Sequence, residues 1–421
     1  MNIRIVFAVF ILTPFLMQGS VRAHTPVAAA YAASLEELVA DTVHHSPGLR
    51  RLQEEYEAAK ARVIDAWLPR DPEVGVDVEG QPDLFRFNRR TDNEYSVTQM
   101  IPFPSKLFLR GLVASKEADI AYRKYKDKER EVIWHIEEPY YKLKLYKKTL
   151  EVSEENRGLL EQILKSAKAR YESNQGSQRD LLKTQIEMSK ISVEVFNLKE
   201  KIHLEEAHIS HVLNKPLPTV YVFPDASPRK PFDYSLEDLE KRALEKRAEL
   251  KAMEEGIERA KLGRTLAATD WLPDITVRYE GRQFRGDDTI AENDTFIGVT
   301  VPVWSLLKGV GGVWKSAGFE TNAAESMYVE TRNEIFLKIH EAYSRVKSSK
   351  NAIDVYENSI LPQAKQEVQV LLASYEAGKA DFLSLIESQK TLKEAEVEYQ
   401  TALTEYEMAV SELKFQVGDD L

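Results

Sequence analysis

The sequence has no cysteine at any of its 421 positions. Disulfide bonds are therefore excluded as a source of stability, and so is an N-terminal cysteine that could carry a lipid. Beyond the first residues there is also no run of about 18 apolar side chains, so the sequence predicts no transmembrane helix. If the chain enters a membrane, β-strands must carry it.

An excess of positive charge is missing too. Asp and Glu number 68 against 57 Lys and Arg, which gives a formal net charge of −11. Because no basic surface is available to neutralise phosphates, nucleic acid is excluded as a partner. Hydrophobic residues make up 43% of the chain, which is enough for a packed core. The abundance of Ala, Glu, Lys and Leu favours long helices.

Motifs of catalysis and metal binding are absent from the sequence as well. There is no nucleophile elbow, phosphate-binding glycine loop or metalloprotease helix, so we expect no enzymatic activity and no cofactor. His203, His208 and His211 lie on one expected helix, but their spacings do not stack them on a single face. The 7 methionines form no paired thioether motif. The sequence therefore predicts no metal site.

Residues 1–23 have the features of a secretory signal peptide. Arg4 precedes an apolar run that extends from Ile5 to Met17. Small residues offer a cleavage site after Ala23 and a second one within Ala28–Ala30. An exported chain without disulfides fits the periplasm, where size and oligomerisation supply the stability.

A heptad pattern organises the C-terminal part of the chain. A helix ends after Tyr375 with Gly378 as its C-terminal cap, and Asp381 caps the next helix. From there small and apolar residues recur at alternating spacings of three and four, which indicates a coiled-coil seam. The seam positions are Leu385, Ser388, Leu392, Ala395, Tyr399, Ala402, Tyr406, Ala409 and Leu413.

The same pattern occurs earlier in the chain, shifted by 204 residues as between Tyr171 and Tyr375. Asn174 stands at the position of Gly378 in this first copy, and asparagine tolerates the left-handed conformation that such a turn needs. The earlier seam positions are Leu181, Thr184, Met188, Ile191, Val195, Leu198, Ile202 and Ile209. The sequence therefore predicts two copies of one long helical hairpin.

Between the helical segments the hydrophobic period changes from 3.6 to 2 residues. Four segments alternate in this way, at about residues 72–80, 94–101, 274–282 and 295–301. One apolar and one polar face match a transmembrane strand whose polar side lines water, and they match an ordinary soluble hairpin as well. The charged side chains that would line a lumen are Glu73, Asp77, Glu79, Arg278 and Glu280.

The order helix, two strands, long helix and return helix occurs twice. Trp67-Leu68-Pro69 and Trp271-Leu272-Pro273 mark the same point in each copy. Pro139 falls inside the first long helix and should bend it or break its hydrogen-bond ladder. The expected units are a signal peptide at 1–23, a first repeat at 24–213 with its hairpin at 106–213, a linker at 214–234, a second repeat at 235–417 with its hairpin at 309–416, and a tail at 418–421.

Four strands cannot close a barrel, and lipid does not tolerate open sheet edges. Four strands from each of three copies give twelve, an even number within the known range of membrane barrels. The expected fold is therefore mainly α with β. A duplicated unit of helix, two strands and long helical hairpin would assemble as a homotrimeric α-helical barrel that is continuous with a 12-stranded transmembrane β-barrel.

Two phrases and the repeated tip motif resemble the outer-membrane factor (TolC) family. The phrases are Ile101-Pro102-Phe103-Pro104-Ser105-Lys106-Leu107 and Ile360-Leu361-Pro362-Gln363-Ala364. The tip motif consists of Tyr171, Asp180-Leu181-Leu182 and Gln185 in one copy, and of Tyr375, Gly378, Ile386 and Gln389 in the other. The resemblance covers about residues 34–417, and both phrases are most similar to the heavy-metal efflux (Czc and Cus) branch.

This resemblance implies a passive channel in the outer membrane. The protein would be a homotrimer with its barrel in outer-membrane lipid and its helical part extending into the periplasm. It would be the exit duct of a tripartite efflux system, joined to an inner-membrane pump through a periplasmic adaptor (membrane fusion) protein. Heavy-metal cations are the expected cargo. The duct would open at its periplasmic tips, where hydrogen bonds and ion pairs hold it shut.

The resemblance also implies roles for residues near the tips. Asp180 and Tyr375 occupy positions that link neighbouring hairpins in the closed state, and Glu387 occupies one that narrows the entrance. Ser384 shares that entrance position but is not acidic, so an acidic ring would rest on Glu387 alone. Ala380 stands where the family carries a basic lock residue, which leaves the closed state held less firmly or by other pairs. The full set of expected tip residues is Asp180, Tyr375, Ser384, Glu387, Tyr171 and Gly378.

Two other functions stay open at this point. A periplasmic coiled-coil adaptor without a pore would carry a single hairpin flanked by lipoyl-like β segments, whereas this sequence has two hairpins. The same type of channel could also serve drug efflux or type I protein secretion, because the pump selects the exported molecule. The cargo, the pump and the adaptor are not determined by the sequence.

Overall fold

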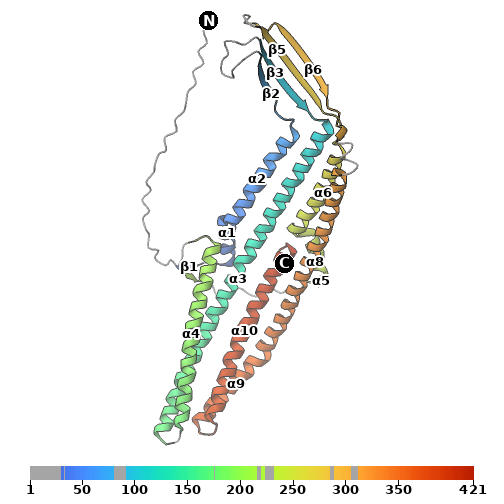
Figure 1. The fold of residues 1–421 in the computed structure, drawn as a ribbon. Coiled ribbons are helices and arrows are strands. Elements are labelled where there is room, and N and C mark those ends of the chain that lie inside the picture. The colour runs from blue at the N-terminus through green and yellow to red at the C-terminus, as the bar shows by residue number, and fades with distance from the viewer. Residues whose placement is uncertain are drawn as a thin grey trace, which may run out of the picture.

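The computed structural model describes residues 30–32, 34–79, 92–174, 176–215, 220–222, 232–284, 289–304 and 312–421. The expected signal peptide at 1–23 lies outside these residues. Within them the chain is mainly helical. Figure 1 shows an elongated molecule with a small sheet at one end and two helical hairpin tips at the other. No described helix has an apolar stretch long enough to cross a bilayer.

The sequence Ser46-Pro47-Gly48 predicts a break in the first helical segment, and the structure has two helices that meet there. Helix α1 spans Leu35–His45 and α2 spans Pro47–Trp67. Ser34 caps α1 in a capping box with Glu37, in which each side chain accepts from the other residue's backbone N–H. Ser46 ends α1 and caps α2, and Pro47 occupies the first turn of α2, where its missing N–H costs nothing.

The corresponding pair in the second half is broken at a residue that gives no such signal. Helix α5 spans Leu236–Lys246 and α6 spans Ala248–Ala268, with Arg247 between them in an extended conformation (φ −62°, ψ 115°). Arg247 is buried and donates to the backbone carbonyl of Phe415. Its guanidinium lies 4.1 Å from the centre of the Phe415 ring and 3.4 Å from Asp127. Tertiary contacts, rather than a local breaker, fix this bend.

A four-stranded antiparallel sheet lies at the far end of these helices. Its strands are β2 (Glu73–Glu79), β3 (Asp92–Ile101), β5 (Ile275–Phe284) and β6 (Glu292–Val299), in the order β2-β3-β5-β6. The expected strands are therefore present, with ends that differ by a few residues. The central pair β3–β5 joins the two halves of the chain, because Val97 faces Val74 on one side and Tyr279 on the other.

A second, smaller sheet lies beside the first hairpin. Strand β1 (Ala30–Ala32) pairs in parallel with β4 (Val220–Val222). The side chain of Tyr221 is fully buried, and its hydroxyl lies 3.0 Å from the hydroxyl of Ser210. The segment expected to link the halves thus contributes a strand and one core residue.

The long helices follow the sheet. Helix α3 spans Pro104–Glu172, and its 69 residues at about 1.5 Å each make it roughly 100 Å long. Pro139, which was expected to bend or break this helix, lies inside it without dividing it. The return helix α4 spans Gln178–Val212.

The second hairpin contains a π-helical turn. Helix α8 spans Val313–Val355, the π turn spans Tyr356–Ile360, α9 spans Leu361–Glu376 and the return helix α10 spans Phe382–Val417. Pro362 stands directly after this turn. Its ring would clash with the carbonyl of residue 358 in a regular α-helix, and the wider π turn gives the ring room.

The predicted heptad seam forms the buried side of α10. Leu385, Ala402, Ala409 and Leu413 are buried, whereas Leu392 is only partly covered. Near the tips, one core cluster takes side chains from both hairpins. Its buried members are Leu160, Ile163, Ala167, Ile191, Val195, Tyr375, Phe382, Leu385 and Ile386. The two hairpins therefore pack against each other within one chain.

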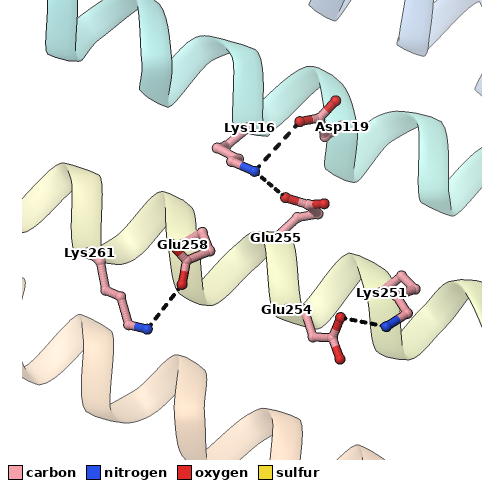
Figure 2. A network of polar contacts seen from close by, with 7 residues as sticks. All are labelled: Lys116, Asp119, Lys251, Glu254, Glu255, Glu258 and Lys261. Carbon is pink, nitrogen blue, oxygen red and sulfur yellow. Dashed lines mark hydrogen bonds and ion pairs between the residues drawn. The ribbon is translucent and has the colours of Figure 1, made fainter. Parts of the chain in front are cut away.

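Charged contacts join the two halves along α3 and α6. Figure 2 shows Lys116 of α3 reaching Glu255 of α6 at 2.6 Å, with Asp119 at 3.9 Å. The hydrogen bond to Glu255 raises the pKa of Lys116, against the opposing effect of partial burial. The other pairs in the view, Lys251–Glu254 and Lys261–Glu258, lie within α6 on its more exposed sides. Exposed pairs of this kind contribute about 0–1 kcal/mol each.

A buried ion pair fixes the junction between sheet and helices. Lys106, 5% exposed, donates to the carbonyl of Leu272 at 2.7 Å and to the carboxylate of Asp274 at 2.9 Å. The same carboxylate oxygen accepts the backbone N–H of Phe103 at 3.0 Å. The contact ties the start of α3, in the first half, to the start of β5, in the second.

Candidate functional site

The two hairpin tips are built on left-handed residues. Asn174 has φ 58° after α3, and Gly378 has φ 74° after α9. Ser177 caps α4 and Asp381 caps α10, each with its side chain accepting a backbone N–H of the first turn. The sequence predicted both left-handed positions and the Asp381 cap correctly.

Tyr375 is the centre of the tip contacts. Its side chain is 3% exposed and packs at 5.9 Å against the ring of Phe382. Arg170 of the neighbouring hairpin donates to the backbone carbonyl of Tyr375 and holds its guanidinium 4.8 Å from the centre of the tyrosine ring. No sequence pattern pointed to Arg170. An arginine near a helix end has many structural uses, and only the packing of the hairpins brings this one to Tyr375.

Asp180 lies on the other hairpin from Tyr375, in the same surface groove. Burial raises the pKa of the Tyr375 hydroxyl, the negative charge of Asp180 raises it further, and Arg170 opposes both. The hydroxyl itself is buried and has no hydrogen-bond partner among the residues that the structure describes. A buried hydroxyl without a hydrogen-bond partner destabilises the fold. A small movement of the hairpins that brought a partner within reach would remove this cost. Asp180 and Tyr375 thus line the same groove from different hairpins, and their role in closing the tips stays a prediction.

The entrance residues lie one turn along α10. Ser384 donates its backbone N–H to Asp381 at 3.0 Å and its hydroxyl to the same carboxylate at 2.6 Å. The hydrogen bonds from Ser384 lower the pKa of Asp381, which keeps that exposed carboxylate charged. Glu387 is exposed and lies outside the groove around Tyr375. Ser384 itself is not acidic, but the carboxylate of Asp381 lies directly beside it.

The remaining tip residues serve the turns. Tyr171 has an exposed ring, and its carbonyl accepts the backbone N–H of Asn174 at 3.0 Å. Gly378 sits beneath the guanidinium of Arg170, where an added Cβ would lie 3.7 Å from the nearest nitrogen. These two residues shape the tip turns.

One face of the large sheet carries the charged side chains. The register places Glu73 and Arg278 on either side of Thr98, and it places Glu280 opposite Ser96. Arg278 forms an ion pair with Glu280 and lies 3.6 Å from Glu94. The members of this charged face are Glu73, Asp77, Glu94, Arg278, Glu280 and Arg282.

Glu94 was not predicted. It lies opposite Asp77 and also opposite Arg282, whose guanidinium is 3.6 Å away. The sequence could not show this cluster, because its members come from strands almost two hundred residues apart. Glu79 ends β2, and its side chain is outside the described part of the structure.

The other face of the sheet is apolar and exposed. It presents Val74, Val76, Tyr95, Val97, Ile275, Val277, Tyr279, Ile297 and Val299. Val74 is 77% exposed and Ile297 is 69% exposed. An exposed apolar patch of this extent marks a surface that contacts lipid or another protein.

The described residues contain no group of three or more His, Asp or Glu side chains arranged to hold a metal ion. His208 lies 3.1 Å from Glu205, and His203 lies 3.4 Å from Glu206. His203 and His208 therefore form separate pairs with neighbouring carboxylates.

Comparison with known proteins relates part of the chain to one protein family. Residues 239–419 match the family described as outer membrane efflux protein. The cobalt-zinc-cadmium resistance protein CzcC of Cupriavidus metallidurans is 25% identical over 127 residues, which cover 30% of this chain and 29% of that protein. The chain thus aligns with less than a third of this relative.

Solved structures share the fold over almost the whole chain. The structure of CusC, which forms a transmembrane channel, superposes with a TM-score of 0.79 at 11% identity, over 95% of this chain and 96% of that one. The outer-membrane channel OprN gives 0.77 at 15% identity, over 92% and 90%. VceC of Vibrio cholerae gives 0.75 at 15% identity, over 91% and 96%. At these identities the likeness shows the fold alone.

The fold is thus that of outer-membrane channels, and residues 239–419 resemble the outer membrane efflux protein family. More narrowly, part of the chain is similar in sequence to CzcC, and the whole chain is similar in fold to CusC.

Proposed function

We propose that the protein is the passive outer-membrane exit duct of a tripartite efflux system. The observation that carries this proposal is the large sheet, which has one exposed apolar face and one face of paired charges. Such a sheet suits a wall between lipid and water. Strands β3 and β5 have 10 residues each, about the length that a tilted strand needs to cross a bilayer.

The duct is a homotrimer, with four strands from each chain in a 12-stranded barrel. The chain consists of two copies of one unit, residues 24–213 and 235–417. The linker at 214–234 joins the copies, and a tail at 418–421 follows them. The order of elements supports this, because helices of 11 and 21 residues precede a strand pair and a hairpin in each half. Charged residues Glu73, Asp77, Glu79, Arg278 and Glu280 line the lumen.

The duct opens at its periplasmic tips. Asp180 and Tyr375 hold neighbouring hairpins together, and Tyr171 and Gly378 shape the turns that carry them. Arg170 supplies the positive charge that the family places at the position of Ala380, since its guanidinium already lies on the Tyr375 ring. Ser384 and Glu387 border the entrance, where Asp381 adds a second carboxylate.

The partners are a periplasmic adaptor protein, which contacts the hairpins, and an inner-membrane pump, which selects the cargo. Outer-membrane lipid surrounds the apolar face of the sheet. The adaptor function considered from the sequence is disfavoured, because outer-membrane channels share this fold over more than nine tenths of the chain.

Heavy-metal cations are the proposed cargo, and the similarity to CzcC supports this choice. The test is a deletion strain challenged with cobalt, zinc, cadmium and copper salts and, in parallel, with a panel of drugs. Increased sensitivity to the metals, restored by the gene on a plasmid, is the expected result. Sensitivity to drugs alone would assign the duct to drug efflux, and a defect in an exported protein would assign it to type I secretion.

A further inference from the structure

The π turn of the second hairpin contributes no side chain to the core. None of its residues, Tyr356–Ile360, is buried, and the three in the middle are exposed. By contrast, Ile353 just before the turn is fully buried, and Ala364 just after it is 5% exposed. A helical segment without buried contacts bends at a lower cost in free energy than the packed segments on either side.

The backbone hydrogen bonds of this turn are also irregular. The N–H of Leu361 donates to the carbonyl of Tyr356, five residues back, and Pro362 has no N–H to continue the ladder. The side chain of Asn358 donates to the carbonyl of Asp354 at 2.9 Å. Sharp bends in long helices occur at π turns and at prolines, and this hairpin has both at one place.

The π turn separates two core clusters of the second hairpin. On the side towards the sheet, one cluster includes Ile353 of α8 and Ala402 of α10. On the side towards the tip, the other cluster includes Tyr375 of α9 and Leu385 of α10. The two clusters share no buried residue. The second hairpin therefore consists of two packed bodies that meet at the turn.

The first hairpin has no such division in α3. This helix continues from Pro104 to Glu172 without a π turn. The shift of 204 residues places Gly158 at the position of Pro362, so the proline is missing there. It also places residues 152–156 at the position of the π turn, and in this stretch Ser153 and Asn156 are buried. The first hairpin is therefore continuous where the second one is irregular.

Buried polar atoms remain unpaired on the tip side of the turn. The side chain of Gln389 is 3% exposed, and within the described part of the chain neither its amide oxygen nor its amide nitrogen has a partner, like the hydroxyl of Tyr375. One carboxylate joins the hairpins at this level. Glu194 accepts from Ser153 of α3 at 3.0 Å and from Lys393 of α10. Because unpaired groups weaken this contact, the hairpins can part here at a modest cost.

We propose that the second hairpin bends at the π turn when the duct opens, so that α9 and the first part of α10 (residues 361–393) swing away from the first hairpin. Glu194 has to release Lys393 in this movement. Lys365 lies 3.4 Å from Glu396 and keeps α10 beside α9, so both helices move together. This inference rests on the proposed opening at the tips and specifies where the hairpin bends.

Spin labels on introduced thiols test the hinge, because the chain has no cysteine of its own. The pair Asn351→Cys and Gln369→Cys brackets the π turn at exposed positions. The control pair Glu151→Cys and Ala169→Cys has the same sequence spacing on exposed positions of α3. Double electron–electron resonance in detergent, with labelled chains diluted in unlabelled ones, should give a broader distance distribution for the pair across the turn. Equal widths would overturn the hinge.

A straightened hairpin provides the matched variant. A π turn contains one residue more than an α turn between hydrogen-bonded groups, so deleting the exposed Ser359 should restore a regular helix. Pro362→Ala is added, because a regular helix has no room for the ring. The distance distribution across the turn should then narrow to the width of the control pair. Circular dichroism checks that the helix content is kept, and the comparison of the two pairs in the parent stands without this variant.

Conductance in planar bilayers connects the hinge to opening. The substitutions Asp180→Ala and Tyr375→Phe, which remove the proposed tip contact, should raise the conductance several-fold, and the straightened hairpin should abolish most of this gain. A gain that persists in the straightened protein would overturn the hinge and leave the duct intact. A protein that forms no pore in any variant would overturn the duct, whereas the distance distributions would still decide whether the hairpin bends at the π turn.

Discussion

At the scale of single residues, the tip turns depend on two left-handed positions with different side chains. Gly378 reaches φ 74° without steric cost, whereas Asn174 reaches φ 58° as one of the few other residues that tolerate this region. The turn after α9 is also the one that carries Tyr375. Strain introduced in this turn should therefore disturb the contacts of Tyr375 with Phe382 and Arg170.

Gly378→Ala should therefore destabilise the second tip by about 1 kcal/mol, because an added Cβ clashes in the left-handed region. Hydrogen exchange of the backbone amides around residues 375–381 measures the effect locally. The matched control is Asn174→Gly, which should change exchange at the first tip by no more than a few tenths of a kcal/mol. Equal exchange in Gly378→Ala and the parent would mean that this turn does not require glycine.

The raised pKa of Glu137 makes the stability of the protein depend on pH. It lies on α3, partly buried, and accepts a hydrogen bond from Ser411 of α10. Burial raises the pKa of Glu137, and the hydrogen bond from Ser411 offsets this only in part. The stability linked to this group is therefore complete below its ordinary pKa of 4.5 and is lost as the pH rises through the higher folded-state value.

Glu137→Gln keeps an acceptor for Ser411 and never carries a charge. Its unfolding temperature should match that of the parent near pH 4 and exceed it at pH 7–8, as measured by circular dichroism in detergent. Glu151→Gln, at an exposed position of the same helix, serves as the control and should shift stability by less than about 0.5 kcal/mol. A Glu137→Gln variant that is less stable at neutral pH would show that the charge is favourable there.

At the scale of elements, the sequence predicted most of the fold because local signals were strong. Ser46-Pro47 marked a helix break, alternation marked four strands, and the heptads marked two hairpins. Pro139 does not divide α3, because the helix continues on both sides of it despite the one missing hydrogen bond. The bend at Arg247 was missed because its cause is a buried contact with Phe415, 168 residues away.

The turns of the candidate site were predictable, because Asn174, Gly378 and Asp381 carry local signals for a left-handed position or a helix cap. The roles of Asp180 and Tyr375 came from the family resemblance and stay predictions. Arg170 and Glu94 were missed because their roles depend on which residues face them in space. A charged residue on a helix or strand has no distinguishing local pattern until its partner is known.

The junction between sheet and helices makes a prediction about Lys106. Lys106→Met removes the ammonium group that donates to the carbonyl of Leu272 and the carboxylate of Asp274. This should lower the free energy of unfolding by about 2 kcal/mol. Lys116→Met removes the more exposed pair with Glu255 in Figure 2 and should cost at most about 1 kcal/mol. Urea unfolding of both variants tests this, and equal losses would show that burial does not strengthen the Lys106 contact.

At the scale of the whole molecule, the tips and the sheet lie at opposite ends of helices roughly 100 Å long. The tip contacts can therefore change without disturbing the wall formed by the strands. Asp180→Ala combined with Tyr375→Phe should raise the resting conductance of the protein in planar bilayers several-fold, because the charge and the unpaired hydroxyl are both removed. Glu73→Gln, in the sheet, is the control for general leakage. A double variant that conducts no more than the parent would place the lock elsewhere.

The proposed duct requires copies of the chain to join through the edge strands of the four-stranded sheet, β2 and β6. Because β2 and β6 are different strands, contact between copies runs head to tail, and such contacts produce either a closed ring or an endless ribbon. Only the curvature of the sheet stops growth after a fixed number of copies. A substitution that flattens the sheet should therefore turn the protein into filaments, even if every strand still pairs correctly.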